Sequence, residues 1–153
     1  VIVKGGRPCM CGRRGCWEAY SAAPALIRQT QSAMQAHPES KLWQAAPQLS
    51  EVSGKTVFQA VAMGDATAQA VLDFYVKALA VGLSNVVNSL DPDVLCLGGG
   101  ISGAGEALMR PLEKAMEGQS YARPGQQTTK LVLAQLGNDA GLVGAAMLHR
   151  QHH

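Results

Sequence analysis

The hydrophobic pattern predicts a long buried helix in the middle of the chain. Between residues 66 and 90, large apolar side chains recur at steps of three and four, which places them on one helical face; they are Leu72, Tyr75, Leu79, Leu83, Val86 and Leu90. Apolar residues also occupy much of the opposite side, so we expect this helix to be central. Asp65 is a suitable N-cap, and Asp91-Pro92 ends the pattern.

Shorter helices are predicted on the N-terminal side of this segment. Residues 17–35 have a helical pattern in which Pro24 lies either in a first turn or between a short and a longer helix. Residues 38–54 are polar and are broken by prolines and a glycine, so we expect a flexible connection with about one helical turn. A further helix is expected over residues 55–63, ending at Gly64.

Two short apolar runs predict strands in the C-terminal half. VLCLGGG (residues 94–100) and KLVLAQL (130–136) lack the alternation of a half-exposed strand, so we expect both faces of each to be covered. A helix is expected between them over residues 105–117, and another after the second run. Strands that alternate with helices indicate an α/β domain. Cys96 lies in the first strand, where a buried, reduced thiol is expected.

Composition and charge narrow the class of protein. With 153 residues and 47% hydrophobic residues, the chain can form one domain with an ordinary core. No uninterrupted apolar run has the roughly 20 residues of a membrane span, so we expect no membrane partner. A net charge of +2 is too small to indicate nucleic-acid binding. Setting Cys96 aside leaves three cysteines, an odd number that argues against a disulfide framework and favours the cytoplasm.

Three of the four cysteines form a cluster near the start of the chain, with the spacing Cys9-x-Cys11-x4-Cys16. Zinc needs a tight fold of the chain around it, and the two glycines between the last two thiols permit such a turn. Three unpaired loop cysteines remain an alternative, and a redox dithiol is disfavoured because the spacing is not C-x-x-C. No fourth ligand lies near the cluster, and no carboxylate or histidine is placed to activate a metal-bound water, so a metal here would be structural.

The sequence CMCGRRGCWEAYS resembles the zinc-binding signature of the ROK family, which comprises repressors, open reading frames and sugar kinases. The resemblance extends through VFQAVAMGDATAQAVLDFYVKALAVGLSNVVNSLDPDVLCLGGGIS to the closing GNDAGLVGAA. It implies an α/β, actin-like (ribonuclease H-like) ATPase-type lobe with a zinc-binding loop over residues 1–16. In the family a histidine upstream of the cysteines is the fourth ligand, and it would fall immediately before Val1. We therefore expect residues 1–153 to be a C-terminal lobe, with the N-terminal lobe absent.

The resemblance implies roles for four further residues. Glu18 matches a glutamate that hydrogen-bonds sugar hydroxyls in the family; from spacing alone, it reads as a solvated glutamate at a helix N-terminus. Gly98, Gly99 and Gly100 match a turn close to nucleotide in the kinases; by themselves they are a strand-to-helix turn, and repressors can keep it for packing. We interpret Asn138 and Asp139, in the closing motif, as helix caps rather than catalytic groups.

Two functions follow from the resemblance. The first is a sugar kinase that holds a structural Zn²⁺ ion and uses ATP and Mg²⁺ to phosphorylate a hexose or N-acetylhexosamine. Its base aspartate is expected in the missing lobe, so the chain alone should be inactive. The second is the sugar-sensing lobe of a transcriptional repressor that binds DNA only through a missing N-terminal domain. Both are expected to be homo-oligomers. A small zinc module that binds nucleic acid through Arg7, Arg13 and Arg14 is disfavoured, because Trp17 is the only aromatic residue among them.

Overall fold

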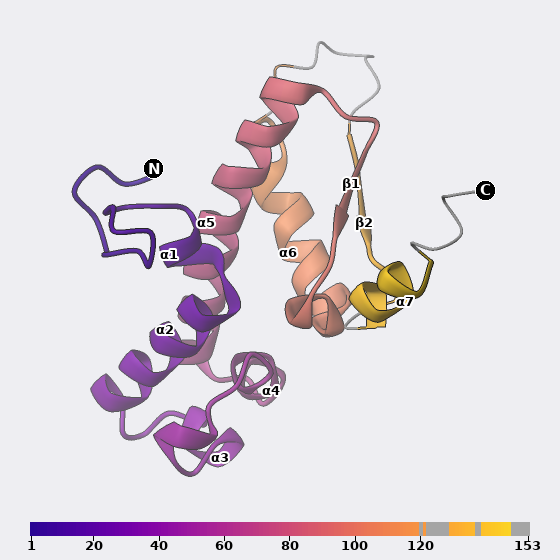
Figure 1. Cartoon of the computed structure of the whole chain (residues 1–153). Helices are drawn as coiled ribbons and strands as arrows, with labels where there is room; N and C mark the ends of the chain where they lie inside the picture. Colours follow the sequence, from indigo (N-terminus) through magenta and orange to yellow (C-terminus); the bar gives the residue numbers. More distant parts are fainter. Residues whose placement is uncertain (120, 122–128, 137–138, 148–153) are drawn as a thin grey trace.

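The computed structural model describes residues 1–119, 121, 129–136 and 139–147. Figure 1 shows a long helix, α5, with the cysteine loop and four shorter helices on one side and α6 with two strands on the other. The elements are α1 (Glu18–Ser21), α2 (Ala23–Ala36), α3 (Leu42–Ala45), η1 (Leu49–Glu51), α4 (Thr56–Ala62), α5 (Ala66–Leu90), β1 (Val94–Leu97), η2 (Gly100–Ala104), α6 (Glu106–Met116), β2 (Lys130–Leu133) and α7 (Ala140–Met147).

The predicted central helix is confirmed. α5 runs for 25 residues, and its Leu72, Tyr75, Leu79 and Leu83 are buried in the main core together with residues of α2, α4 and α6. The left-handed conformation of Asp91 ends the helix. By length and composition α5 could cross a membrane, but 56% of its apolar window is buried inside the domain. The surrounding helices therefore identify it as the core helix of a globular domain.

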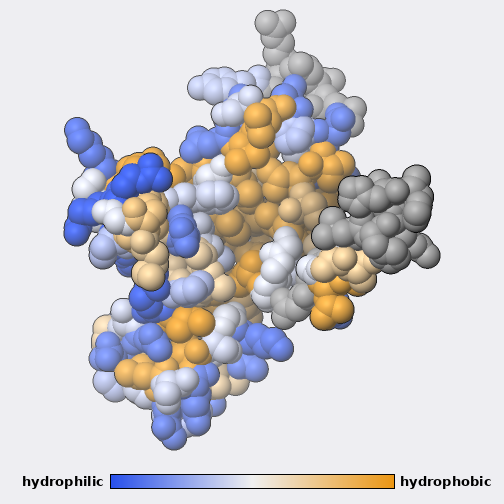
Figure 2. Space-filling view, in the orientation of Figure 1, coloured by the Kyte–Doolittle hydropathy of each residue, from blue (hydrophilic) through white to orange (hydrophobic). Residues whose placement is uncertain are grey.

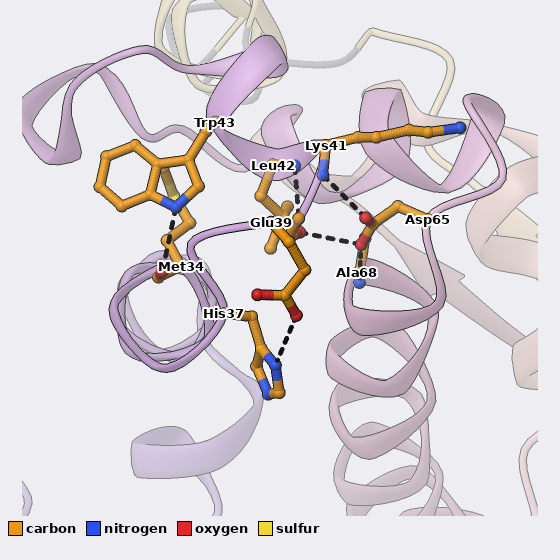
Figure 3. Close-up of polar contacts among 9 residues, drawn as sticks. Met34, His37, Glu39, Lys41, Leu42, Trp43, Asp65 and Ala68 are labelled. Carbon is orange, nitrogen blue, oxygen red and sulfur yellow. Dashed lines mark hydrogen bonds and ion pairs between the residues drawn. The ribbon is translucent and has the colours of Figure 1, made fainter.

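The N-terminus of α5 is fixed by Asp65, as predicted from the sequence. One carboxylate oxygen accepts hydrogen bonds from the backbone N–H of Ala68 at 2.6 Å and from the Ser40 hydroxyl at 3.0 Å. The other accepts the backbone N–H of Lys41 at 2.8 Å, as Figure 3 shows. A single carboxylate thus joins the start of α5 to the segment that enters α3.

The helix expected over residues 17–35 is divided into α1 and α2. Ala22 has an extended conformation, with ψ of 158°, and interrupts the helical hydrogen bonding. Pro24 follows at the start of α2, where the amide hydrogen that it lacks would have no intrahelical partner. Pro24 therefore lies in the first turn of α2 and also at the division between a short and a longer helix, so the structure agrees with both interpretations.

Residues 38–54, expected to be a flexible connection, contain α3 and η1. Leu42 and Ala46 are buried in the core, and the Trp43 indole donates a hydrogen bond to the backbone oxygen of Met34 at 3.0 Å. Figure 3 shows this Trp43 contact beside the Asp65 network. The connection therefore packs on the body of the domain through its few apolar side chains.

β1 and β2 form a parallel pair in which Val94 lies opposite Lys130 and Leu97 opposite Leu133. The prediction that both faces would be covered is wrong for β1. Leu95 and Leu97 pack against the core, whereas Val94 and Cys96 are exposed. Among the described residues, helices cover only one face of this sheet. β2 also ends at Leu133, earlier than its apolar run suggested.

Candidate functional site

The cysteine cluster is formed by a tight hairpin. Cys9 donates its backbone N–H to the Arg13 carbonyl at 2.9 Å, and Gly12 donates back to Cys9 at 3.0 Å. This turn brings the sulfurs of Cys9, Cys11 and Cys16 within 4.8 Å of one another. The Sγ atoms of Cys11 and Cys16 are 3.5 Å apart, and all the cysteines are free thiols.

The donor set fits a zinc ion. Thiolates bound to tetrahedral zinc at about 2.3 Å have sulfurs about 3.8 Å apart, which agrees with the observed grouping. Arg13 favours the thiolate, because hydrogen bonds from its backbone and side chain lower the pKa of Cys11 to about 6. The pKa of Cys16 is raised, chiefly by its hydrogen bond with Cys11. Among the described residues, no fourth ligand joins the three sulfurs.

The aromatic residues after the cluster attach the cysteine loop to α5. The Trp17 indole donates a hydrogen bond to the Ala78 carbonyl at 2.9 Å and lies against the Cα of Gly82. The Tyr20 hydroxyl accepts the backbone N–H of Arg7 at 2.8 Å. Tyr75 of α5 in turn donates its hydroxyl to the Ser21 carbonyl at 2.7 Å. These contacts give the loop and α1 a fixed position on the core helix.

Glu18 lies at the start of α1 and faces the cysteine cluster. Its Oε2 is 3.7 Å from the Cys9 sulfur, so a Cys9 thiol can donate to the carboxylate. Glu18 and Cys9 line one cavity of about 580 Å³, together with Arg28 and Ser32 of α2. This volume is within the range of small-molecule sites. Arg28 and Ser32 were not identified from the sequence, because only the fold of α2 against the loop brings them to Glu18.

The three glycines occupy a second region. Gly98 follows β1, Gly99 has φ of 82°, and Gly100 begins η2, so the predicted strand-to-helix turn is present. Gly100 lines a cavity of about 320 Å³ with Lys55 and Phe58. Gly98 and Gly99 are not among the lining residues of that cavity. Lys55 is exposed and also borders this cavity.

The closing motif lies partly within the described structure. Asn138 is outside the described residues. Asp139 directly precedes α7 and donates its backbone N–H to the Leu136 carbonyl at 2.9 Å. The two proposed sites, at Glu18 and at Gly100, share no lining residue.

The structure of the chain is similar to the solved structures of a glucokinase and of a transcriptional regulator. A ROK family glucokinase from Streptomyces griseus, in complex with glucose and AMPPNP, matches 98% of the chain at 32% identity with a TM-score of 0.87, covering 49% of that protein. A ROK family transcriptional regulator, a homologue of the E. coli MLC protein, matches 97% of the chain at 28% identity with a TM-score of 0.78, covering 36% of that protein.

The chain belongs to the ROK family, whose model matches residues 1–152. Curated relatives include a glucokinase from Halalkalibacterium halodurans, 35% identical over 99% of the chain and 46% of that protein. An N-acetyl-D-glucosamine kinase from Salmonella paratyphi B is 29% identical over 94% of the chain and 42% of that protein. The chain spans about half the length of the curated relatives it matches.

Proposed function

We propose that this chain is the C-terminal sugar- and nucleotide-binding lobe of a cytoplasmic ROK sugar kinase. The whole protein would transfer the γ-phosphate of ATP to a hydroxyl group of a hexose or N-acetylhexosamine. The observation that carries the proposal is the Glu18 carboxylate, held 3.7 Å from the Cys9 sulfur at the edge of a 580 Å³ cavity. The similarity to glucokinases and to an N-acetyl-D-glucosamine kinase supports the substrate class.

Glu18 would act by binding and orienting the sugar. A carboxylate accepts hydrogen bonds from two neighbouring hydroxyls, and a site built in this way rejects molecules that lack them. Phosphoryl transfer depends mainly on holding nucleotide, Mg²⁺ and acceptor in line, so a rigidly held sugar contributes directly to the rate. The base aspartate would lie in the other lobe, so we assign no catalytic base to this chain.

Cys9, Cys11 and Cys16 would hold a structural zinc ion, with a fourth ligand from outside the described cluster. Bound zinc would act as a cross-link that fixes the hairpin. Because Cys9 borders Glu18 and the hairpin also lines the sugar cavity, a fixed hairpin gives the carboxylate a defined position. Trp17 would pass this rigidity to α5 through its hydrogen bond to Ala78, while Tyr20 would hold the loop through its hydrogen bond with the backbone of Arg7.

The glycine turn would receive the adenosine part of ATP. Gly98, Gly99 and Gly100 let a ligand approach the backbone closely, and the adjoining cavity offers the Phe58 ring for stacking and the Lys55 ammonium for phosphate oxygens. AMPPNP and glucose occur together in the complex of the similar Streptomyces griseus enzyme, which supports separate sites for nucleotide and sugar.

The test is isothermal titration calorimetry, in which glucose and N-acetylglucosamine are each titrated into the chain. We expect Glu18→Gln to weaken binding of the recognised sugar at least about tenfold, since a charged acceptor is replaced by a neutral amide. Glu113→Gln, an exposed change on α6, is the matched control and should leave affinity unchanged. Equal affinities for wild type and Glu18→Gln would contradict the proposed role of Glu18.

The repressor lobe is a second candidate, favoured by the structural match to the transcriptional regulator. The two candidates differ in nucleotide binding. A kinase lobe should bind Mg-ATP, and Phe58→Ala should weaken that binding by removing the stacking surface. A repressor lobe should bind sugar and show no saturable ATP binding. Fluorescence anisotropy with a labelled ATP analogue, competed with unlabelled ATP, separates these outcomes.

A further inference from the structure

A third cavity, distinct from the sugar and nucleotide cavities, lies between α2 and the N-terminal half of α5. Its volume is about 490 Å³, and most of its wall is apolar. The apolar lining consists of Ala33, Ala36, Ala66, Ala70, Val71 and Phe74. Phe74 is 45% exposed, so part of its ring surface is open to contact with a ligand.

Arg7 places a positively charged guanidinium group in the wall of this apolar cavity. Its guanidinium carbon lies 5.3 Å from the centre of the Tyr20 ring and 5.5 Å from that of Phe74. Cation–π contacts with two rings hold the group in place while leaving its N–H donors available. Neither ion pair found in the described part of the chain involves Arg7.

The remaining polar groups of the cavity indicate the charge of its ligand. His37 also lines it, but this ring is already paired with Glu39 at 3.2 Å. Arg7 is therefore the only cation in the cavity wall without an acidic partner, which suits a single negative charge. A guanidinium matches a carboxylate in planar, bidentate geometry, whereas a doubly charged phosphate would call for further cations.

Gln29 of α2 contributes a polar side chain to the wall of this cavity. This residue is only 7% exposed and lines the cavity. Its Nε2 donates to the Tyr20 carbonyl at 2.9 Å, but its Oε1 is buried without a hydrogen-bond partner. This oxygen has less than 1 Å² of accessible surface, so we assign it no contact with a ligand in the cavity.

We propose that this cavity binds a small monocarboxylate with an apolar body, in addition to the sugar and nucleotide of the proposed function. The carboxylate would pair with Arg7, and the body would lie on Phe74 and Val71. Because Arg7 and Ser32 also line the cavity that contains Glu18, the two ligands would share two wall residues. The site is independent of phosphoryl transfer, so its test does not depend on kinase activity.

The probe is 3-phenylpropionate, titrated into the ¹⁵N-labelled chain and followed by NMR chemical shifts. We expect saturable shifts in residues of α2 and α5, with a dissociation constant of about 1–10 mM for a ligand of this size. The uncharged isostere 3-phenylpropanamide should bind about tenfold more weakly, because it cannot form the ion pair. Arg7→Gln should weaken the binding of 3-phenylpropionate until its affinity equals that of 3-phenylpropanamide.

A blocking variant separates this cavity from non-specific binding. Ala70→Trp fills the cavity from an exposed position on α5 and should abolish binding, while Gln69→Trp, on the neighbouring exposed position outside the cavity, should not. Equal binding of acid and amide, or binding that survives Ala70→Trp, would overturn the proposal. So would a wild-type dimer that Ala70→Trp dissociates, since that result would assign the cavity to a subunit interface.

Discussion

Gly12 and Gly15 both lie in the cysteine loop with positive φ angles, but only Gly15 also lies against another part of the backbone. A Cβ atom built on Gly15 would overlap the Val3 carbonyl oxygen, whereas one on Gly12 would meet open space. Gly12→Ala should therefore cost only the strain of the left-handed conformation, about 1–2 kcal/mol. Gly15→Ala should cost more, because the loop segment that carries Val3 must move as well.

Urea denaturation of the two alanine variants measures this difference directly. Zinc affinity, measured by competition with a chromophoric chelator, should fall more for Gly15→Ala, since the same turn positions Cys16. Equal losses of stability for the two variants would show that Val3 can move away from the new methyl group without lowering the free energy of unfolding. The difference between the two variants measures the steric contact separately from the backbone strain, because both variants add a methyl group at a residue with a positive φ angle.

At this scale the sequence indicates which side chains carry chemistry but not how they are held. The spacing of Cys9, Cys11 and Cys16 predicts a cluster, and the structure brings these sulfurs together. The contact of Trp17 with α5 could not be predicted, because Ala78 is 61 residues away along the chain. Arg7 likewise shows no special character until the fold places it over two rings.

Helix α5 contains a glycine whose replacement should have the opposite of its usual effect. An alanine in a helix interior is normally more stable than a glycine by about 0.5–1 kcal/mol. At Gly82 the new methyl group would overlap the Trp17 indole, so we expect Gly82→Ala to lower the free energy of unfolding by about 1–3 kcal/mol.

Gly144 of α7 is the matched control, since a Cβ there meets nothing within 4 Å. Gly144→Ala should leave thermal stability unchanged or raise it. Differential scanning calorimetry of both variants shows whether each substitution raises or lowers the thermal stability. A stabilising Gly82→Ala would mean that Trp17 does not pack on α5 in solution.

The Asp65 cap predicts a pH dependence of stability. Burial of Asp65 by itself would raise its pKa, but hydrogen bonds from the backbone N–H groups of Ala68 and Lys41 and from the Ser40 hydroxyl outweigh it and lower the pKa below 3.8. A lowered pKa in the folded state stabilises the protein above the unfolded-state value. This contribution is present at pH 5 and above, and it is lost as the pH falls below about 4.

Asp65→Asn should therefore lower the free energy of unfolding by about 1–3 kcal/mol at pH 7 and flatten its decline between pH 5 and pH 3. Asp73→Asn, an exposed change on the same helix, should change stability by less than about 0.5 kcal/mol. Urea denaturation at several pH values provides the measurement. If the free energy of unfolding declined with the same slope between pH 5 and pH 3 in wild type and in Asp65→Asn, the assigned pKa shift would be refuted.

The sequence predicts whole elements better than their breaks and exposed faces. α4, α5 and α6 follow from periodicity and from Asp65, Gly64 and Asp91, which act locally at helix ends. Pro24 indicates a break in this region, but the position of the break at Ala22 has no local signal, because alanine is the strongest helix former. The exposed side of β1 could not be predicted either. An apolar sequence allows both faces of a strand to be buried, but the neighbouring elements determine which face is covered.

At the scale of the molecule, the proposed sites for sugar and nucleotide lie on this chain, whereas the base aspartate is expected in the other lobe. Phosphoryl transfer requires all of these groups together, so we expect no kinase activity from the 153 residues by themselves. A coupled assay for ADP release, with glucose and with N-acetylglucosamine, checks this expectation. Turnover that requires both sugar and ATP would place a complete catalytic site within the chain.

The exposed apolar residues of the C-terminal half predict self-association. Val94 is 53% exposed on the open side of β1, and Leu142 of α7 is 77% exposed. Figure 2 shows hydrophobic side chains gathered over the middle of the visible face, around α5 and the strands. Monomeric proteins rarely expose large contiguous patches of this kind. A second copy of the chain could cover them, consistent with the expected homo-oligomer.

Sedimentation velocity between about 5 and 200 μM, in reductant so that the exposed Cys96 stays a thiol, should show a sedimentation coefficient that rises with concentration. Leu142→Lys should suppress the rise, because a charge in an apolar contact must be desolvated. Met63→Lys, a change of the same kind at a 42% exposed position after α4, should leave it intact. A wild-type chain that stays monomeric throughout this range would show that solvent, rather than a second copy, covers the open face of the sheet.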